Sequence, residues 1–461
     1  MSDPESSITF GNSRKTTETP TRVGNSGQSG TGYERDRPGR ATDSVQSDEF
    51  DKGPPLMPSL VAWLDASSED QRRMRDIIRL FAERESRDEL GLGQIRDAIA
   101  DSLFPGTSTL LTRARYLLLV PWAYQKASRR PNPAADADRY ERDIIHAVRD
   151  SGDYAGLLGM QAGEALKNLP SAIYWTMLRH YGILADASLS RDDALRLDGM
   201  STSGDDLGDM SGTRFHAWST TLPSAPEGFP KSIPDGFSLQ PDEAAWLRDR
   251  ILDEAAGSLF AHLAVERPTA ESSAPWADSA ALSADGEAHE QLADARAFSA
   301  LMHGAQLLYN LLLAEEYQDA GYDRLSDPSQ GFRDRLTRWS DDLPAMVDLT
   351  TWNLEALLAR VELTRGSPIN LNSRRFVRGW RDLLAEQGTD ALVEGAAARA
   401  FMTRRERQHK GAQARLGNRA RLASWGGSSG AGALVYRWPQ VRGILLDIHD
   451  GLERTPEMAD A

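Results

Sequence analysis

The sequence predicts a mainly α-helical protein, with two helical domains, a short β element near the C-terminus and a disordered polar tail at the N-terminus. Three observations support this prediction. Apolar residues recur at i, i+3, i+4 and i+7 in most segments after residue 58, which is the spacing of an amphipathic helix. Ser67 and Ser68 precede acidic residues, as N-capping residues do. The alternation of β-branched and polar residues that marks strands is nearly absent.

Residues 1–57 are predicted as the disordered tail. Only eight of the first 53 residues are apolar or alanine, so this stretch buries too little surface to offset the entropy lost on ordering. The folded part is expected to begin near Pro58. Its first helical pattern contains Met74, Ile77, Ile78 and Phe81 on one face.

The N-terminal helical domain is predicted over residues 58–197. A helix with Ile95, Ala98, Ile99 and Leu103 inward is followed by the turn FPGTS (104–108), which is expected to start the next helix. That helix carries the run LLLV (117–120), which is apolar all round and therefore central to the core, and Pro121 is expected to kink or restart it. Further helices are predicted at 135–151, 156–168, 171–182 and 190–197.

An acidic, Pro-rich linker is predicted at 198–240, and a C-terminal helical domain at 241–455. The linker contains DGMSTSGDDLGDMSG and a stretch with four prolines, which indicates a domain boundary. The segment ALVYRW (433–438) is the best candidate for a strand. Helices of the second domain are predicted at 241–266, 288–318, 329–340, 349–363, 372–387 and 391–408.

Composition excludes several classes of protein. The chain has no cysteine, which excludes disulfides, thiolate zinc sites, iron–sulfur clusters and cysteine nucleophiles. No apolar run approaches the ~18–20 residues of a membrane helix, so no membrane partner is expected. The N-terminus lacks the apolar core of a signal peptide, and we expect a cytoplasmic protein. A formal net charge of −15 disfavours indiscriminate coating of DNA.

The basic arm, residues 396–422, departs from this acidic background. Its eight basic residues stand against one acid, Glu406, and arginine matches the geometry of phosphate groups. A nucleic-acid contact is therefore one interpretation, and pairing with the protein's own acids is the other. The candidate nucleic-acid-binding residues are Arg399, Arg404, Arg405, Arg407, Lys410, Arg415, Arg419 and Arg421.

A second candidate, for anion binding, lies at FPGTSTLLTRARY (104–116). Helix N-termini attract anions through their free N–H groups, and hydroxyl side chains here precede an apolar helix with two arginines. The plainer interpretation is that the hydroxyls cap the helix. The residues concerned are Gly106, Thr107, Ser108, Arg113 and Arg115.

Signatures of catalysis are absent from the sequence. The glycines between 426 and 432 lack the register of a dinucleotide loop, and no Walker A loop, H-E-x-x-H motif or G-x-S-x-G elbow occurs. Asp65 is a candidate metal carboxylate but is better explained as a helix cap. Tyr436 and Trp438 are suited either to stacking on bases or to covering the core. Catalytic residues stay unknown, and no metal site or cofactor is predicted.

Four segments carry a family resemblance: WLDAS (63–67), RDELGLGQIRDAIADSLFPGTSTLLTRARYLLLVPW (87–122), LPSAIYWTMLRHYGI (169–183) and the ending from Ala414 to Leu452. On these segments the chain resembles an uncharacterised prokaryotic family, domain of unknown function 6361. The resemblance spans about Trp63 to Leu452. It implies an accessory protein of anti-phage defence islands, near helicases, methyltransferases and phospholipase-D-like proteins, and it implies no catalytic residue.

Together, the residues and the resemblance predict a non-enzymatic accessory component of an anti-phage defence system. This component is expected to bind nucleic acid, DNA in particular, or to scaffold partners such as a helicase or a phospholipase-D-like protein. Two alternatives stay open. One is a metal-dependent nuclease or other effector whose scattered carboxylates converge in the fold. The other is a purely structural assembly subunit.

Overall fold

The computed structural model describes residues 88–152, 155–160, 166–203, 216–389 and 395–455, and these residues confirm the mainly α-helical fold. No strand occurs among them, and one isolated antiparallel bridge joins Leu184 to Trp218. The predicted tail 1–57 and the predicted helix around Met74 lie outside the described residues. All described residues belong to one compact unit.

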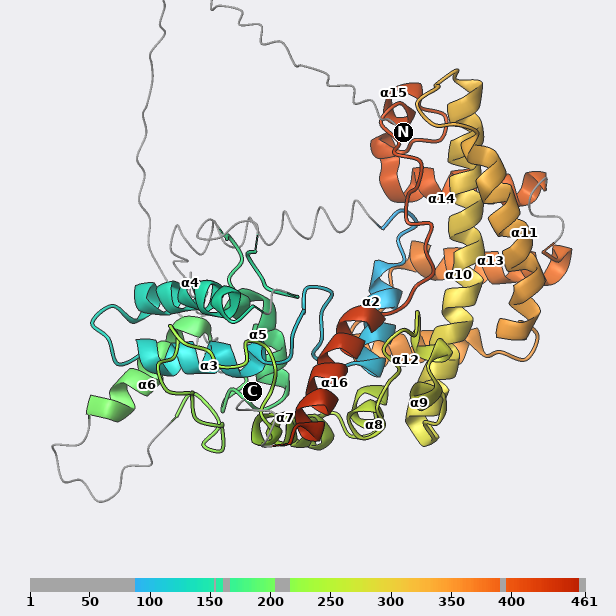
Figure 1. Cartoon of the computed structure of the whole chain (residues 1–461). Coiled ribbons are helices and arrows are strands. Elements are labelled where there is room, and N and C mark those ends of the chain that lie inside the picture. Colours follow the sequence, from blue (N-terminus) through green and yellow to red (C-terminus); the bar gives the residue numbers. More distant parts are fainter. Residues whose placement is uncertain (1–87, 153–154, 161–165, 204–215, 390–394, 456–461) are drawn as a thin grey trace, which may run out of the picture. The chain divides into compact units, whose positions relative to one another are not determined.

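The helices before residue 216 that the structure describes are α2 (Gly93–Leu103), α3 (Tyr116–Ala127), α4 (Pro133–Asp150), α5 (Pro170–His180) and α6 (Arg191–Ser203). Those after it are α7 (Pro241–Glu254), α8 (Leu259–Val265), α9 (Ser279–Leu282), α10 (Gly286–Asp319), α11 (Pro328–Met346), α12 (Leu354–Arg365), α13 (Leu371–Gln387), α14 (Ala396–Lys410), α15 (Arg419–Leu422) and α16 (Trp438–Glu453). Figure 1 labels them along the chain.

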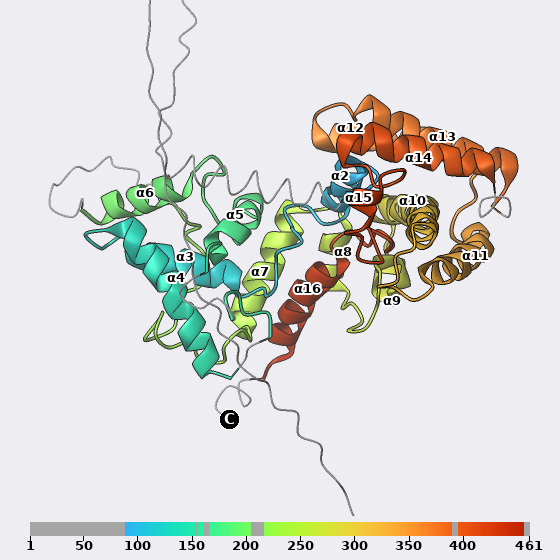
Figure 2. The same ribbon diagram turned by 90° about the horizontal axis from the view of Figure 1, so that it is seen from above.

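The first two turns of helix α3 are buried on all sides, as the apolar run at 117–120 predicts, and only Lys126 near its end is exposed. Helices α4, α5 and α6 pack against it, and Figure 2 shows α3 and α4 side by side. Pro121 lies inside α3 without ending it. The core around α3 therefore depends on one short helix whose residues from Tyr116 to Tyr124 are all buried.

The start of α3 differs from the prediction, because the helix begins at Tyr116 and not after the turn at 104–108. The backbone N–H groups of Thr112 and Arg113 donate to the Tyr174 hydroxyl at 2.9 and 3.0 Å. The N–H of Ala114 donates to Asp447 at 2.8 Å. Side chains from distant helices thus satisfy these donors, so the segment does not need to be helical.

Residues 216–240 of the predicted linker pack onto α3. The side chains of Trp218, Phe229 and Phe237 are buried. Trp122 on α3 contacts Phe229, with 5.6 Å between ring centroids, and its Nε1 donates to the carbonyl of Pro223 at 2.7 Å. This part of the linker therefore contributes to the core. The division of the chain into two helical domains stays a prediction.

Two predicted helices in this region have different bounds. Of the predicted helix 156–168, the described residues 156–160 form turns, with Gly156 and Gly159 at φ 78° and 86°. The predicted helix 241–266 is divided into α7 and α8. The division occurs because the Ser258 hydroxyl accepts the N–H of Ala261 at 3.2 Å and so caps a new helix.

The predicted strand ALVYRW (433–438) is wrong. Tyr436 and Arg437 have φ angles of 49° and 66°, and α16 begins directly afterwards at Trp438. Left-handed backbone at two successive residues prevents an extended strand. Tyr436 and Trp438 are buried, so they cover the core.

Helix α10 is the central helix of the second half of the chain. It contacts α2, α8, α11, α13 and α14, and Figure 1 shows it running beside α11. By length and composition α10 could cross a membrane, but nearly all of its most apolar stretch is buried in the fold. Trp339 of α11 packs over Gly304, and its Nε1 donates to the carbonyl of Ala300 at 2.8 Å. These contacts define a core helix.

Candidate functional site

Helix α14 contains most of the basic arm and has two contrasting faces. On its inner face Ala398, Met402, Arg405 and Glu406 are buried. It packs on α10 and, through Phe401, on α13, whose Phe376 ring stacks 5.6 Å from that of Phe401. Two charged residues of the basic arm, Arg405 and Glu406, are therefore core residues.

Arg405 is 3% exposed and is held by neutral groups. Its Nε donates to the carbonyl of Leu90 at 2.8 Å, and its Nη2 donates to the Ser373 hydroxyl at 3.0 Å. The guanidinium also lies 4.8 Å from the centre of the Phe376 ring. Burial lowers the pKa of Arg405 to about 10, so it stays charged at neutral pH. Its role is to fasten α14 to the segment before α2.

Glu406, the single acid of the arm, is fully buried and accepts three hydrogen bonds. The donors are the Tyr309 hydroxyl at 2.6 Å and the backbone N–H groups of Arg415 and Leu416, each at 2.9 Å. Burial and the nearby Glu406 carboxylate raise the pKa of Tyr309 well above its usual range. Glu406 thus ties the loop after α14 to the central helix α10.

Glu89, which precedes α2, binds two further members of the arm. Its carboxylate pairs with Lys410 and, at 2.9 Å, with Arg415, and its Oε2 lies 3.2 Å from the Tyr309 hydroxyl oxygen. Because Glu89 is only 7% exposed, these charges interact in a partly dehydrated environment. Lys410 and Arg415 are therefore held by the protein itself.

The remaining members of the arm divide into bound and exposed residues. Arg399 pairs with Glu315, and Arg419 donates to the carbonyl of Ala320 at 3.0 Å. Three side chains are exposed and make no hydrogen bond or ion pair with the part of the chain that the structure describes. We call these the exposed arginines: Arg404, Arg407 and Arg421.

The turn of the second candidate site is held within the fold. The Thr107 hydroxyl is buried and donates to the carbonyl of Phe104 at 2.7 Å, and the Ser108 hydroxyl accepts the N–H of Leu110 at 3.3 Å. Gly106 has φ 71°, and a Cβ there would lie 2.8 Å from His180. Because α3 begins only at Tyr116, these hydroxyls do not cap that helix. The neighbouring N-cap residue of α16, Arg437, donates to the carbonyl of Thr107 at 2.7 Å.

The two arginines of that candidate site are both paired. The Nε of Arg113 lies 3.0 Å from both carboxylate oxygens of Asp447. Arg115 is 1% exposed, binds Glu243 at 3.0 Å and donates to the carbonyls of Pro234 and Gly236. Burial of this kind indicates that Arg115 joins the linker to α3 and α7.

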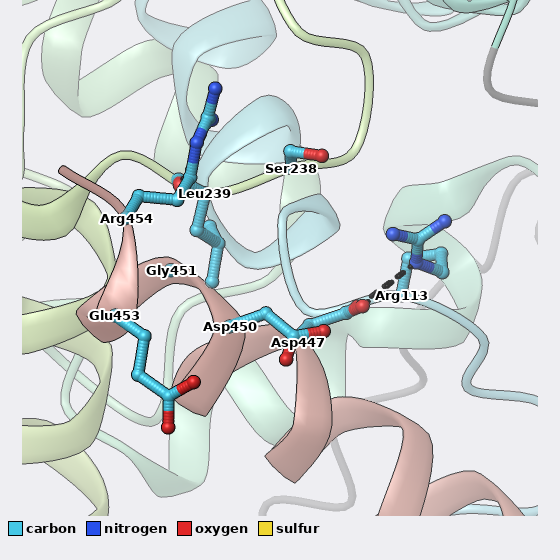
Figure 3. Close-up of a pocket in the computed structure, with 8 residues that line it drawn as sticks. All are labelled: Arg113, Ser238, Leu239, Asp447, Asp450, Gly451, Glu453 and Arg454. Carbon is cyan, nitrogen blue, oxygen red and sulfur yellow. Dashed lines mark hydrogen bonds and ion pairs between the residues drawn. The ribbon is translucent and has the colours of Figure 1, made fainter. Parts of the chain in front are cut away.

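Arg113 and Asp447 line a polar cavity of about 480 Å³ along the last turns of α16, drawn in Figure 3. Burial raises the pKa of Asp447, while Arg113 acts in the opposite direction. Asp450 and Glu453 also line the cavity, and both pair with Arg267. Within the described ranges no three His, Asp or Glu side chains form a group that could hold a metal ion.

The sequence did not reveal the partners of the basic arm. Glu89, Tyr309 and Glu315 are far from the arm in sequence, and no local motif marks them. One signal was available: an acid isolated among eight basic residues, Glu406, proves to be buried.

Fold and site define an all-helical protein in which buried carboxylates anchor a basic segment near the C-terminus, while a few of its arginines face solvent. The chain belongs to a family of unknown function, DUF6361, which matches residues 58–451. No curated protein and no solved structure matches it.

Proposed function

We propose that this protein is a non-enzymatic accessory component of an anti-phage defence system that binds the phosphate backbone of DNA. The exposed arginines Arg404, Arg407 and Arg421 are the proposed contacts. The observation that supports this is the contrast within one segment. Glu89, Glu315 and Glu406 bind the inner members of the arm, whereas these three guanidinium groups have no described carboxylate partner.

The rigid support of these arginines strengthens the proposal. Arg404 and Arg407 project from α14, whose other face is fixed by Arg405 and Glu406. The guanidinium of Arg407 also lies against the loop at Gly417, where an added Cβ would stand 2.8 Å from its Nη2. Cations carried on a fixed helix lose less entropy on binding phosphate than cations on a freely moving segment. Contacts of this kind give affinity without sequence preference.

The same proposal includes a scaffold function, in which this protein binds a helicase or a phospholipase-D-like protein in the cytoplasm. Its support is the resemblance of the chain to proteins of defence islands. The nucleic-acid contact is the part that a purified protein tests directly.

The test is fluorescence anisotropy of a labelled DNA duplex over a salt series. Three phosphate contacts predict a log–log slope of the binding constant against salt near −3, at about −0.9 per phosphate. Changing Arg404→Glu together with Arg407→Glu should flatten that slope by about two units. Since both side chains are exposed, the unfolding free energy should change by less than about 1 kcal/mol.

A matched control is Arg129→Glu with Lys231→Glu, which alters the net charge equally at two exposed positions outside the basic arm. If the control weakens binding as much as the α14 variant, or the wild-type protein does not bind at about 50 mM salt, the proposal fails. The same reaction is run with Mg²⁺. Cleavage of the DNA would replace the non-enzymatic proposal with the nuclease alternative.

A further inference from the structure

Helix α13 carries four arginines, and three of them are paired with carboxylates. These pairs are Arg374 and Arg378 with Glu355 or Glu362 of α12, and Arg381 with its neighbour Asp382. The fourth, Arg375, is exposed and makes no hydrogen bond or ion pair with the residues that the structure describes. Arg375 is therefore uncompensated among the described residues, and it lies outside the basic arm.

Arg375 lies on the side of α13 that meets α14. Gly379 follows it by four residues and so belongs to the same stripe of the helix. A Cβ added to Gly379 would lie 3.0 Å from the Phe401 ring of α14. Arg404 follows Phe401 by three residues, which places it on the stripe of α14 that meets α13. The two arginines therefore border the contact between these helices, which lie side by side in Figure 2.

The same contacts set the level of the two arginines along the helices. Arg405 donates to the Ser373 hydroxyl at 3.0 Å, near the start of α13. Phe401, one turn earlier in α14, meets Gly379 further along α13, so the two helices run antiparallel. Interpolation between these contacts places the two uncompensated arginines at the same level, to within about one turn. Because the axes of packed helices lie about 8–10 Å apart, two extended arginine side chains at one level can reach the same small anion.

The charge at this contact favours an anionic ligand. Two like charges placed close together repel each other, and no carboxylate of the described residues compensates either Arg375 or Arg404. This is unusual in a chain of net charge −15, whose other α13 arginines are all paired. Guanidinium groups match the geometry of phosphate. A phosphodiester group has two unesterified oxygens, and so it can accept hydrogen bonds from one arginine on each helix.

We propose that Arg375 is a further contact to the DNA backbone, and that it and Arg404 together hold one phosphate across the contact between α13 and α14. The inference rests on the proposed function, because Arg404 belongs to both. It extends the binding surface from the basic arm to a second helix. The aromatic packing of Phe376 on Phe401, at 5.6 Å between ring centroids, keeps the two arginines in a fixed arrangement.

The test is a double-mutant cycle in the full chain, with the affinity for a labelled DNA duplex measured by fluorescence anisotropy at about 50 mM salt. Arg375→Gln and Arg404→Gln should each weaken binding at least about threefold. Because either change disturbs the same phosphate, the double variant should be weakened less than the product of the two single effects, by about threefold or more. Additive effects would show that the two arginines do not share a phosphate and would overturn the proposal.

Arg378→Gln is the matched control, since it removes the same charge from the same helix on the side that pairs with Glu355. It should change DNA binding by less than about twofold. An Arg375→Gln effect no larger than this control, with Arg404→Gln still weakening binding, overturns this inference alone. Absence of binding by the wild-type protein overturns the proposed function instead. Arg375→Glu adds a stability readout: its carboxylate should pair with Arg404, raise the urea midpoint above wild type and weaken DNA binding more than Arg375→Gln, whereas a lowered midpoint contradicts the arrangement.

A competition experiment distinguishes DNA from the acidic surface of a partner protein. Polyglutamate and unlabelled duplex are each used to displace the labelled duplex from the wild-type protein. Polyglutamate should need a charge concentration at least about tenfold higher, because its carboxylates lie on a flexible chain that loses more entropy on binding than a duplex does. Displacement at equal charge concentration would make these arginines a site for acidic proteins and would overturn the proposal.

Discussion

Replacing Glu406 by alanine tests whether the basic arm is anchored as described. The change removes the acceptor of the Tyr309 hydroxyl at 2.6 Å and of the N–H groups of Arg415 and Leu416, both at 2.9 Å. Each buried donor left without a partner costs about 1–3 kcal/mol. The Tyr309 hydroxyl can still donate to Glu89, whose Oε2 lies 3.2 Å away, so the loss comes mainly from the two backbone N–H groups and the loop that they anchor. We expect a loss of about 3–5 kcal/mol.

Urea unfolding followed by tryptophan fluorescence measures this loss. Glu406→Gln should lie between wild type and Glu406→Ala, because the amide keeps one acceptor oxygen but turns its NH2 group toward a second donor. Glu316→Ala is the matched control, since Glu316 also binds the loop, through the N–H of Gly417 at 2.8 Å, but from a half-buried position and in a solvent-exposed hydrogen bond. A Glu406→Ala loss no larger than that of Glu316→Ala would refute the reasoning.

Two further predictions concern the core. Gly304→Ala should lower the unfolding free energy by about 1–3 kcal/mol although alanine favours helices, because its Cβ would lie 2.2 Å from the Trp339 indole. Gly331→Ala, whose Cβ would have no atom within 4 Å, should raise the unfolding free energy by up to about 1 kcal/mol. The reverse order of stability in urea unfolding would contradict this packing. Burial raises the pKa of Glu141 from 4.5 to about 7, so the folded state keeps a proton that the unfolded state loses, and stability should fall as the pH rises from about 5 to 8. Glu141→Gln should abolish this fall and should raise the unfolding free energy by up to about 3 kcal/mol at pH 8. If the variant instead melts at a lower temperature than the wild-type protein at pH 8, the fold stabilises the Glu141 carboxylate and this prediction is wrong.

The fold class and most helices could be predicted because helical spacing is a local property of the sequence. Helices α10 and α13 lie within a few residues of their predicted ranges. The wrong elements depend on distant partners. Residues 109–115 read as the start of a helix, but Tyr174 and Asp447 take their N–H groups, and neither could be identified from the segment itself.

The candidate site also combines a property that the sequence revealed with one that depends on distant residues. Charge density in the sequence correctly marked residues 396–422 as unusual, but it did not distinguish Arg405, which is buried, from Arg404, its exposed neighbour. Adjacent residues in a helix point about 100° apart, so one can enter the core while the next faces solvent. Which of the two faces inward depends on where α10 and α13 pack.

By itself the sequence determined that this chain is helical, contains no cysteine, is acidic overall and has one strongly basic segment. These properties follow from composition and from spacings of three or four residues. The tertiary structure alone decided that Glu89 and Glu406 hold Lys410 and the loop at Arg415, and that Arg404 and Arg407 face solvent. The contact of Glu89 with Lys410 joins residues 321 positions apart, and only the packing of whole helices brings such residues together.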